Sequence, residues 1–214
     1  MWRDLPALAR HACADGVLPV AEGIGTGDVI ILETERLVLR EFVLDDAPFI
    51  LDLLNQPSFH RFIGDKGVRT LEDARAYLRQ GPIDSYATHG FGLYHVALKE
   101  SMLPIGMCGL LKREALPHPD IGFAFLPAYW SRGYATESAR AVLDYAVEVL
   151  ALNRILAVTS TDNHDSMNLL GRLGFRSDGT VRLTVNGPDL TLLARVSQAG
   201  ATAVRPGDRP RTHP

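Results

Sequence analysis

The segment between residues 120 and 150 places the strongest constraint on how this chain folds. It opens with an apolar run, residues 120–126, that has the length of a strand. Pro127 ends this strand because proline has no N–H to donate to a ladder. Apolar residues then recur at helical spacing, which predicts a helix over about residues 134–150. The sequence therefore predicts a strand, a short loop and a helix in direct succession.

The loop between this strand and helix has features of an anion-binding site. The first N–H groups of a helix have no partner within the helix, and the helix dipole makes that end positive. Gly133 lets the backbone approach an anion closely, Ala135 keeps the wall small, and Arg132 adds a positive charge. An ordinary strand-to-helix turn has a similar pattern. The loop lacks the glycine patterns of triphosphate and dinucleotide sites, which disfavours a nucleotide-binding module.

A longer string around the loop is more specific. Residues 130–135, Trp-Ser-Arg-Gly-Tyr-Ala, resemble the Gln/Arg-x-x-Gly-x-Gly/Ala pyrophosphate loop of the GNAT superfamily of N-acetyltransferases. Residues 129–137, Tyr-Trp-Ser-Arg-Gly-Tyr-Ala-Thr-Glu, are similar to its branch of ribosomal-protein serine/alanine N-acetyltransferases. Trp130 replaces the Gln/Arg of the superfamily, as is usual in that branch. Ser131 stands where the branch often has glycine.

Two strings far from this loop resemble the same family. Residues 33–40, Glu-Thr-Glu-Arg-Leu-Val-Leu-Arg, resemble its opening strand. Residues 163–175 resemble its pattern of Asn-x-x-Ala/Ser, a leucine-rich helix and Leu-Gly-Phe, although a well-capped amphipathic helix has the same features. The matching positions are Asn163, Ser166, Leu173, Gly174 and Phe175. The resemblance covers about residues 30–196.

The whole pattern predicts one α/β domain with a mixed, mostly antiparallel central sheet flanked by helices. The runs typical of strands are residues 29–32 leading into 37–42, then 90–98, 105–111, 120–126, 154–160, 180–185 and 190–196. Further helices are expected from Asp45 or Asp46 until Pro57, from Thr70, and from Asn163, with a loop after Pro57. The family resemblance implies that two neighbouring strands splay apart to hold acetyl-CoA.

The predicted acetyltransferase domain spans residues 29–196. Residues 1–28 contain several glycines and no sustained period, so we expect a flexible N-terminal extension. Residues 197–214 are rich in Gly, Pro, Arg and Thr, and we expect a disordered C-terminal tail.

Composition excludes several classes of protein. A net charge of −3 over 214 residues gives no support for binding nucleic acid. Cys13 and Cys108 form no disulfide scaffold or metal motif, the histidines show no metal-ligand spacing, and Cys108 is expected in the core. No apolar stretch approaches the length of about 20 residues that crosses a membrane, and Asp4 and Arg10 interrupt any signal peptide. We therefore expect a cytoplasmic protein with no metal and no membrane partner.

The resemblance also implies where acetyl-CoA binds. The pantetheine arm is expected along the strand at Phe123, Ala124 and Phe125, where a backbone N–H near Phe125 is the expected donor to the oxyanion. Asn163 is expected to hydrogen-bond the cofactor arm. The diphosphate is expected on the backbone N–H groups of Ser131, Arg132, Gly133, Tyr134, Ala135 and Thr136.

Proton transfer needs an acid and a base. Many family members protonate the leaving thiolate with a tyrosine at the position that Leu170 occupies here. Ser166 fills the position at which the serine/alanine branch carries a serine with this role, so Ser166 is the candidate acid, with helix capping as the alternative. An incoming amine is mostly protonated at neutral pH and requires a base. Asp120 is the candidate base, and Glu114 and His118 are nearby alternatives.

The sequence thus predicts acetyl transfer from acetyl-CoA to a primary amine, either a protein N-terminus or a small amine, by direct attack in a ternary complex. A protein that binds acyl-CoA for regulation and has lost turnover is the alternative, since a leucine replaces the tyrosine. The acceptor depends on cleft loops that carry no general code. A homodimer is left open.

Overall fold

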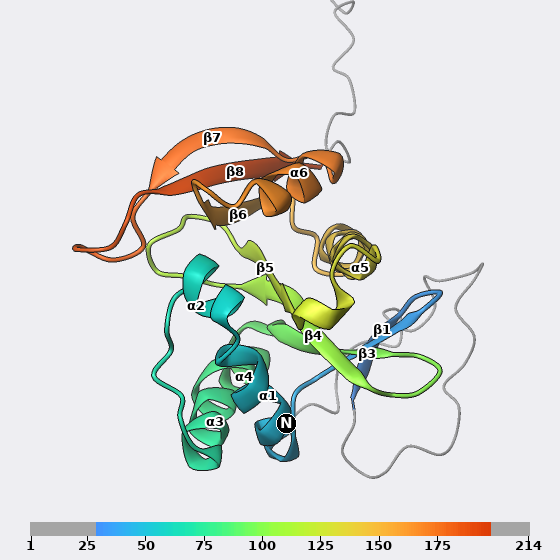
Figure 1. Ribbon diagram of the computed structural model, residues 1–214. Helices are drawn as coiled ribbons and strands as arrows, with labels where there is room; N and C mark the ends of the chain where they lie inside the picture. Colours follow the sequence, from blue (N-terminus) through green and yellow to red (C-terminus); the bar gives the residue numbers. More distant parts are fainter. Residues whose placement is uncertain (1–28, 198–214) are drawn as a thin grey trace, which may run out of the picture.

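The computed structural model describes residues 29–197 and contains one eight-stranded sheet in the order β1-β2-β3-β4-β5-β6-β8-β7 (Figure 1). The strands are β1 (Ile30–Glu33), β2 (Leu37–Arg40), β3 (Leu93–Leu98), β4 (Pro104–Leu111), β5 (Asp120–Phe125), β6 (Arg154–Ser160), β7 (Arg176–Val181) and β8 (Leu190–Val196). Neighbouring strands are antiparallel except for β5 and β6, which are parallel. This confirms the predicted α/β domain with a mixed sheet. The predicted extension at residues 1–28, and the predicted tail from residue 198 onward, lie outside the described residues.

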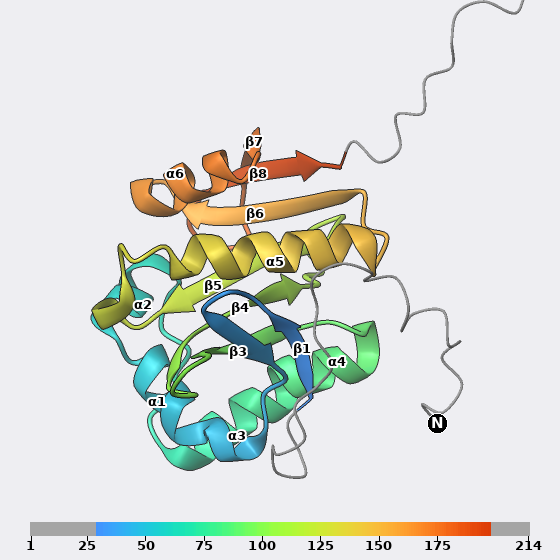
Figure 2. The same cartoon turned by 90° about the vertical axis from the view of Figure 1, so that its right-hand side faces the viewer.

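Helices cover both sides of the sheet. They are α1 (Ala47–Leu54), α2 (Pro57–Phe62), α3 (Leu71–Leu78), α4 (Asp84–His89), α5 (Tyr134–Glu148) and α6 (His164–Arg172). The four helices α1–α4 form a layer on one side of β4 and β5, and α5 lies on the other (Figures 1 and 2). Each side has its own hydrophobic core: α5 and α6 pack in one, and α1–α3 pack in the second with Phe42, Leu93 and Met107.

The parallel pair β5–β6 is joined over a very short length. Its register contains only the pair Asp120 and Leu156, and the Leu156 N–H donates to the Pro119 carbonyl at 2.9 Å. Farther along, the two strands diverge, so the backbone edge of β5 toward Phe125 is open on the β6 side. This is the splayed strand pair that the family resemblance implies. Helix α5 connects the end of β5 to the start of β6.

The helical layer is attached to the sheet by a buried tyrosine. The Tyr86 hydroxyl on α4 accepts the Phe42 N–H at 3.1 Å and donates to the Leu93 carbonyl. Tyr86 is 7% exposed, and this burial raises the pKa of its hydroxyl far above the ordinary value. Because an unmade hydrogen bond is costly in the core, this contact fixes α4 against β3.

Local signals placed most elements correctly, with corrections around two prolines. Pro57 does not simply end the first helix: it is the first residue of α2, because proline is well suited to the first helical position. The predicted loop after Pro57 is therefore helical as far as Phe62. The chain also stays helical through a π-turn at Arg79–Ile83 into α4, which the sequence pattern does not indicate because Pro82 lies inside it.

Two predicted turn features are confirmed and one strand is shifted. Thr70 caps α3 by accepting the Asp73 N–H at 3.1 Å, while Asp73 accepts the Thr70 N–H at 2.9 Å. Gly174 follows α6 with φ of 89°, the left-handed conformation of a helix C-terminus. The strand predicted at 180–185 is β7, which lies earlier at Arg176–Val181 because the turn toward β8 already starts at residue 182.

The predicted burial of Cys108 is confirmed. Its side chain is 0% exposed on β4, and burial raises the pKa of the thiol to about 12. Within residues 29–197, no helix is both long enough and apolar enough to cross a bilayer. The same described residues contain no group of three or more His, Cys, Asp or Glu side chains placed to hold a metal ion.

Candidate active site

The open end of the β5–β6 pair leads into a cleft of about 1960 Å³. One half is lined by the end of β5, the loop before α5 and the start of α6. The other half is lined by α2, the α2–α3 loop, α3 and the loop between β4 and β5. All three strings that resemble the family contribute to the lining, although residues 33–40 and 163–175 lie more than a hundred positions apart in the sequence. We call these halves the loop half and the helical half.

The backbone of β5 has one bonded edge and one open edge. The Leu126 N–H donates to the Ile105 carbonyl of β4 at 2.9 Å, and antiparallel alternation then also directs the backbone of Ala124 toward β4. The N–H and C=O groups of Phe123 and Phe125 consequently point toward β6 and the cleft. The Phe125 carbonyl is already taken, because the Trp130 indole N–H donates to it at 2.8 Å. Of the three strand residues expected to contact the cofactor, Ala124 therefore lines the cleft with its side chain only.

The loop before α5 is wound tightly by two left-handed residues. Ser131 has φ of 57° and Gly133 has φ of 83°. Left-handed backbone strains a serine but not a glycine, so Ser131 is held in a conformation that glycine would adopt more easily. The first intrahelical bond of α5 runs from the Glu137 N–H to the Gly133 carbonyl at 3.0 Å. The preceding N–H groups, those of Tyr134, Ala135 and Thr136, thus lie ahead of the helical bonding pattern at a positive helix end.

Five of the six predicted loop residues line the cleft, and Arg132 is the exception. Its guanidinium lies over the Tyr129 ring, 5.7 Å from the centroid, and its carbonyl accepts from Arg36 at 3.1 Å. Arg140, farther along α5, does line the cleft. The arginine of α5 that lines the cleft is therefore Arg140, and the loop residue Arg132 does not line it.

A carboxylate in the first turn of α5 holds the loop to the β1–β2 connection. Glu137 accepts the Thr34 hydroxyl at 2.6 Å, the Arg36 N–H at 3.0 Å and the Arg36 Nε at 2.7 Å. The same guanidinium lies over the Tyr134 ring at 4.6 Å. Partial burial raises the pKa of Glu137, but these hydrogen bonds outweigh it and hold the pKa below 4.5. Two of the family-like strings are thus in direct contact through one charged network.

The start of α6 presents a hydroxyl to the cleft. Asn163 caps the helix, since its Oδ1 accepts the Ser166 N–H at 3.1 Å. The Ser166 hydroxyl makes no hydrogen bond within residues 29–197 and is half-buried in the cleft wall. Capping therefore uses the backbone of Ser166 and leaves its side chain available. Leu170, one turn later, is 2% exposed in the core.

The base of the cleft contains a buried carboxylate. Asp120, the first residue of β5, is 1% exposed, and both of its oxygens accept the Arg113 Nε, at 2.9 and 3.0 Å. Burial raises the pKa of Asp120 to about 6 in spite of the Arg113 cation, which lowers it. Glu114 and His118, the two alternatives, are not among the residues that line the cleft.

Comparison with known proteins agrees with this geometry. A family model described as acetyltransferase (GNAT) domain matches residues 36–176. The chain belongs to the GNAT acetyltransferase family. A GNAT relative, the uncharacterized N-acetyltransferase YoaA of Bacillus subtilis strain 168, is 30% identical over 154 residues, which cover 71% of this chain and 86% of that protein.

Solved structures share the GNAT fold. An acetyltransferase of the family from Bacillus anthracis is 25% identical with a TM-score of 0.64, and the match covers 77% of this chain and 96% of that one. The ribosomal L7/L12 alpha-N-protein acetyltransferase RimL, solved in complex with coenzyme A, is 18% identical with a TM-score of 0.67. The match covers 78% of this chain and 97% of that one. The family expected from three short strings is thereby confirmed.

Several polar side chains in the helical half were not found from the sequence. Arg113, Lys66 and Tyr77 line the cleft, yet each comes from a segment without a recognisable motif. Three further charged side chains of this region have partners on the protein: Asp65 and Arg69 bind each other, and Arg61 pairs with Asp162 at 3.1 Å. The Arg61–Asp162 contact joins side chains that lie 101 positions apart in the sequence, so no local signal indicates it.

Replacing Glu137 with Gln should loosen the loop. We expect the Kd for coenzyme A, measured by calorimetry, to rise about 3- to 10-fold, and the free energy of unfolding at neutral pH to fall by about 1 kcal/mol. The pKa of Glu137 is lowered on folding, so this stability difference is complete above pH 4.5 and disappears as the pH falls through the lowered value. Urea unfolding at several pH values measures it.

The matched control for this change is Glu148→Gln, at an exposed position of the same helix. It should alter neither coenzyme A binding nor stability. Equal effects of the two substitutions would show that the network around Glu137 does not hold the loop.

Proposed function

We propose that this protein is an acetyl-CoA-dependent N-acetyltransferase that acts on a primary amine, either a protein N-terminus or a small amine, by direct attack in a ternary complex. The observation that carries the proposal is the divergence of β5 and β6 next to a helix N-terminus, with an unengaged serine hydroxyl at the start of α6 in the same half of the cleft. An extended thioester fits such an opening, with its charged end at the helix and its acyl end deep in the cleft.

The loop half supplies the contacts for the donor. The diphosphate binds the N–H groups of the loop, from Ser131 to Thr136, and the pantetheine amides lie along the open edge of β5. Since the Phe125 carbonyl is engaged by Trp130, the groups offered there are the N–H groups of Phe123 and Phe125 and the carbonyl of Phe123. The Oδ1 of Asn163 is occupied by the helix cap, so its amide nitrogen is the group for the cofactor arm.

The reaction needs two proton transfers and one charged intermediate. The neutral amine attacks the thioester carbonyl carbon, a C–N bond forms, and the C–S bond breaks as the oxyanion collapses. The Phe125 N–H stabilises that oxyanion, and Ser166 donates a proton or hydrogen bond to the leaving thiolate. The proton lost by the amine passes to Asp120 through water, because this carboxyl lies at the base of the same cleft.

One observation favours a second function. Leu170 is buried where many family members have the tyrosine acid, which is compatible with a protein that binds acyl-CoA for regulation without turnover. The two functions differ in whether thiol is released when an amine is present.

Thiol release from acetyl-CoA tests the proposal. The purified chain is assayed with peptides that begin with Ser, Ala or Met, with free amino acids, with polyamines and with aminoglycosides. We expect amine-dependent release with one of these classes. Tight coenzyme A binding without release across the whole panel would support the regulatory function instead.

Ser166→Ala tests the acid. We expect kcat to fall about 10- to 100-fold while the KM for acetyl-CoA stays nearly constant, because the substitution keeps the N–H that donates to the capping Asn163 side chain. Stability should be unchanged by urea unfolding. Ser177→Ala on β7, an exposed serine outside the cleft, is the matched control. Full turnover of Ser166→Ala with an unchanged pH profile would remove Ser166 from the mechanism.

Asp120→Asn tests the base through the pH profile. With a peptide acceptor whose amine has a pKa of about 8, both amine and base must be deprotonated. The pKa of Asp120 is raised to about 6, so the wild-type plot of log kcat/KM against pH should have two rising limbs. Below pH about 6 the slope should be about two, and from there to the pKa of the amine it should be about one. In Asp120→Asn the steeper limb should be absent and kcat lower.

A control for the loss of an ion pair is Asp178→Asn, which breaks the surface contact with Arg154 at 2.6 Å. It should keep the wild-type profile. A steep acidic limb that persists in Asp120→Asn would assign the base to another group.

A further inference from the structure

We infer that the acceptor of this enzyme carries a carboxylate beside its reacting amine, and that Arg113 and Lys66 in the helical half of the cleft bind that carboxylate. This rests on the proposed acetyl transfer and narrows its acceptor to amino acids or to peptides with an acidic residue close to the N-terminus. The residues concerned belong to the helical half and are separate from the loop that receives the diphosphate.

Arg113 is anchored at one end and unengaged at the other. Its Nε donates to both oxygens of Asp120, but its two terminal nitrogens make no hydrogen bond with any residue from 29 to 197. The side chain is 35% exposed and lines the cleft. A guanidinium held rigidly by Nε presents its outer N–H groups as a fork, the geometry that binds a carboxylate with two parallel hydrogen bonds.

Lys66 supplies a second cation to the same half of the cleft. Its ammonium has no hydrogen bond or ion pair within the described part of the chain. Much of the side chain is exposed, yet partial burial of the ammonium and the nearby Arg113 charge lower its pKa. An anion placed between these two cations would remove their mutual repulsion.

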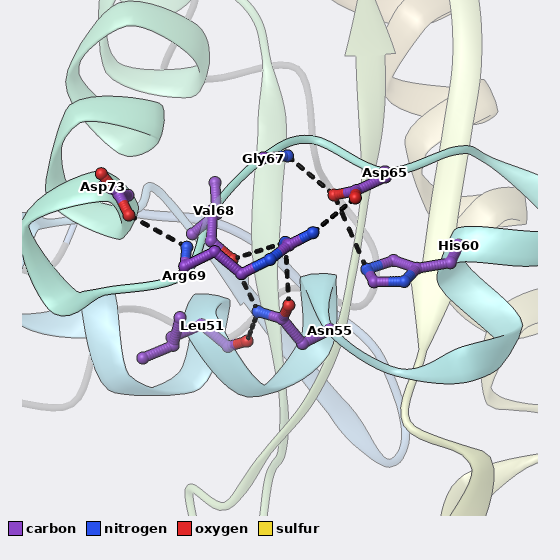
Figure 3. Close-up of polar contacts among 8 residues, drawn as sticks. All are labelled: Leu51, Asn55, His60, Asp65, Gly67, Val68, Arg69 and Asp73. Atoms are coloured by element: carbon purple, nitrogen blue, oxygen red, sulfur yellow. Dashed lines mark hydrogen bonds and ion pairs between the residues drawn. The ribbon is translucent and has the colours of Figure 1, made fainter.

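The loop that carries Lys66 is held in shape by its neighbours (Figure 3). Asp65 accepts the Gly67 N–H at 2.8 Å and binds the Arg69 guanidinium. Arg69 also donates to the Asn55 side chain at 3.2 Å, and Asn55 in turn donates to the Val68 carbonyl at 2.9 Å. The residues on both sides of Lys66 are therefore fixed, whereas Lys66 itself is left to face the cleft.

Tyr77 completes the subsite as a neutral donor. Its hydroxyl lines the cleft and makes no hydrogen bond within residues 29–197. Burial raises the pKa of Tyr77 to about 12, and the Arg113 charge acts on it in the opposite direction, so the hydroxyl is protonated at neutral pH. A phenol that feels the Arg113 charge adds a further hydrogen-bond donor for an anion in this half of the cleft.

The position of this subsite separates it from the donor phosphates. Arg113 is bound to Asp120 at the first residue of β5, whereas the diphosphate loop follows the last residue, Phe125. Six strand residues span roughly 17–20 Å. An anion at Arg113 is therefore not a phosphate held by the loop.

The charges of the helical half also oppose a purely cationic acceptor. Its cations are Arg61, Lys66, Lys112 and Arg113, of which Arg61 pairs with Asp162 and Arg113 pairs with Asp120. Within the described residues, Lys66 and Lys112 have no ion-pair partner, and Asp84 on the neighbouring α4 is the one further carboxylate that lines this side. A polyamine would bring further positive charge to this surface, whereas an amine with a carboxylate offers both the nucleophile and a counter-charge.

Matched acceptors test the inference. Thiol release is compared for alanine with alaninamide, and for a peptide beginning Ser-Asp with one beginning Ser-Asn. We expect kcat/KM to be at least about 10-fold higher for the carboxylate member of one pair, through KM rather than kcat. The pair that responds distinguishes a free amino acid from an acidic peptide. Equal use of both members in both pairs would overturn the inference.

Lys66→Met is the more informative variant, because it leaves the Arg113–Asp120 contact intact. The KM for the preferred carboxylate acceptor should rise about 5- to 10-fold, with kcat and the rates for the neutral partner unchanged. Arg113→Gln should raise the same KM by about 30-fold or more. Lys99→Met removes an equal charge from the surface pair with Glu33 and should change neither value. A Lys66→Met enzyme with wild-type selectivity would contradict the subsite.

A binding measurement separates this inference from the proposed function. Calorimetry with coenzyme A-saturated protein compares N-acetylalanine with its amide, and the N-acetylated Ser-Asp peptide with its Ser-Asn partner. Tighter binding of a carboxylate, lost in Lys66→Met, supports the anion subsite even if no amine is acetylated. No preference in binding or turnover rejects the subsite, while thiol release with any amine still upholds acetyl transfer.

Discussion

Two parallel strands that pair at one position and then separate are the constraint on which the rest of this structure depends. A continuous β5–β6 ladder would use the backbone groups of Phe123 and Phe125 for the sheet. Separation leaves those groups at an edge, in a place that solvent or a ligand must occupy. The flanking antiparallel pairs β4–β5 and β6–β8 are long and regular, so each half of the sheet keeps its strand in place while the gap stays open.

The gap between β5 and β6 would not by itself bind an acetyl-CoA donor. The second requirement is a rigid loop before α5, at the open end of the gap. Rigidity there comes from outside the loop, because Ser131 is held in a conformation that serine does not favour. Glu137 supplies the necessary anchoring by joining the first turn of α5 to Thr34 and Arg36. The β1–β2 connection therefore contributes to the site through support of the loop, although it begins almost a hundred residues earlier.

The loop half of the site was accessible from the sequence, because its signals are local. A proline after an apolar run, Gly133 at a helix start and Asn163 at a helix cap each reflect a backbone requirement within a few residues. The helical half was not accessible. The contact between Arg113 and Asp120 depends on how the loop between β4 and β5 folds back on the sheet, and the position of Lys66 depends on how the helical layer packs there. The helical role of Pro57 was missed for a related reason, since proline both ends and begins helices.

The ion pair between Arg61 and Asp162 connects the two walls of the cleft. It joins α2 to the turn before α6, two elements that otherwise belong to different cores, and the two side chains are 66% and 56% exposed to solvent. Such a pair contributes only about 0–1 kcal/mol and is weakened by ordinary salt. Across this cleft, the two walls are thus connected by a contact that thermal motion and salt break readily, so this contact does not hold α2 and the start of α6 at a fixed separation.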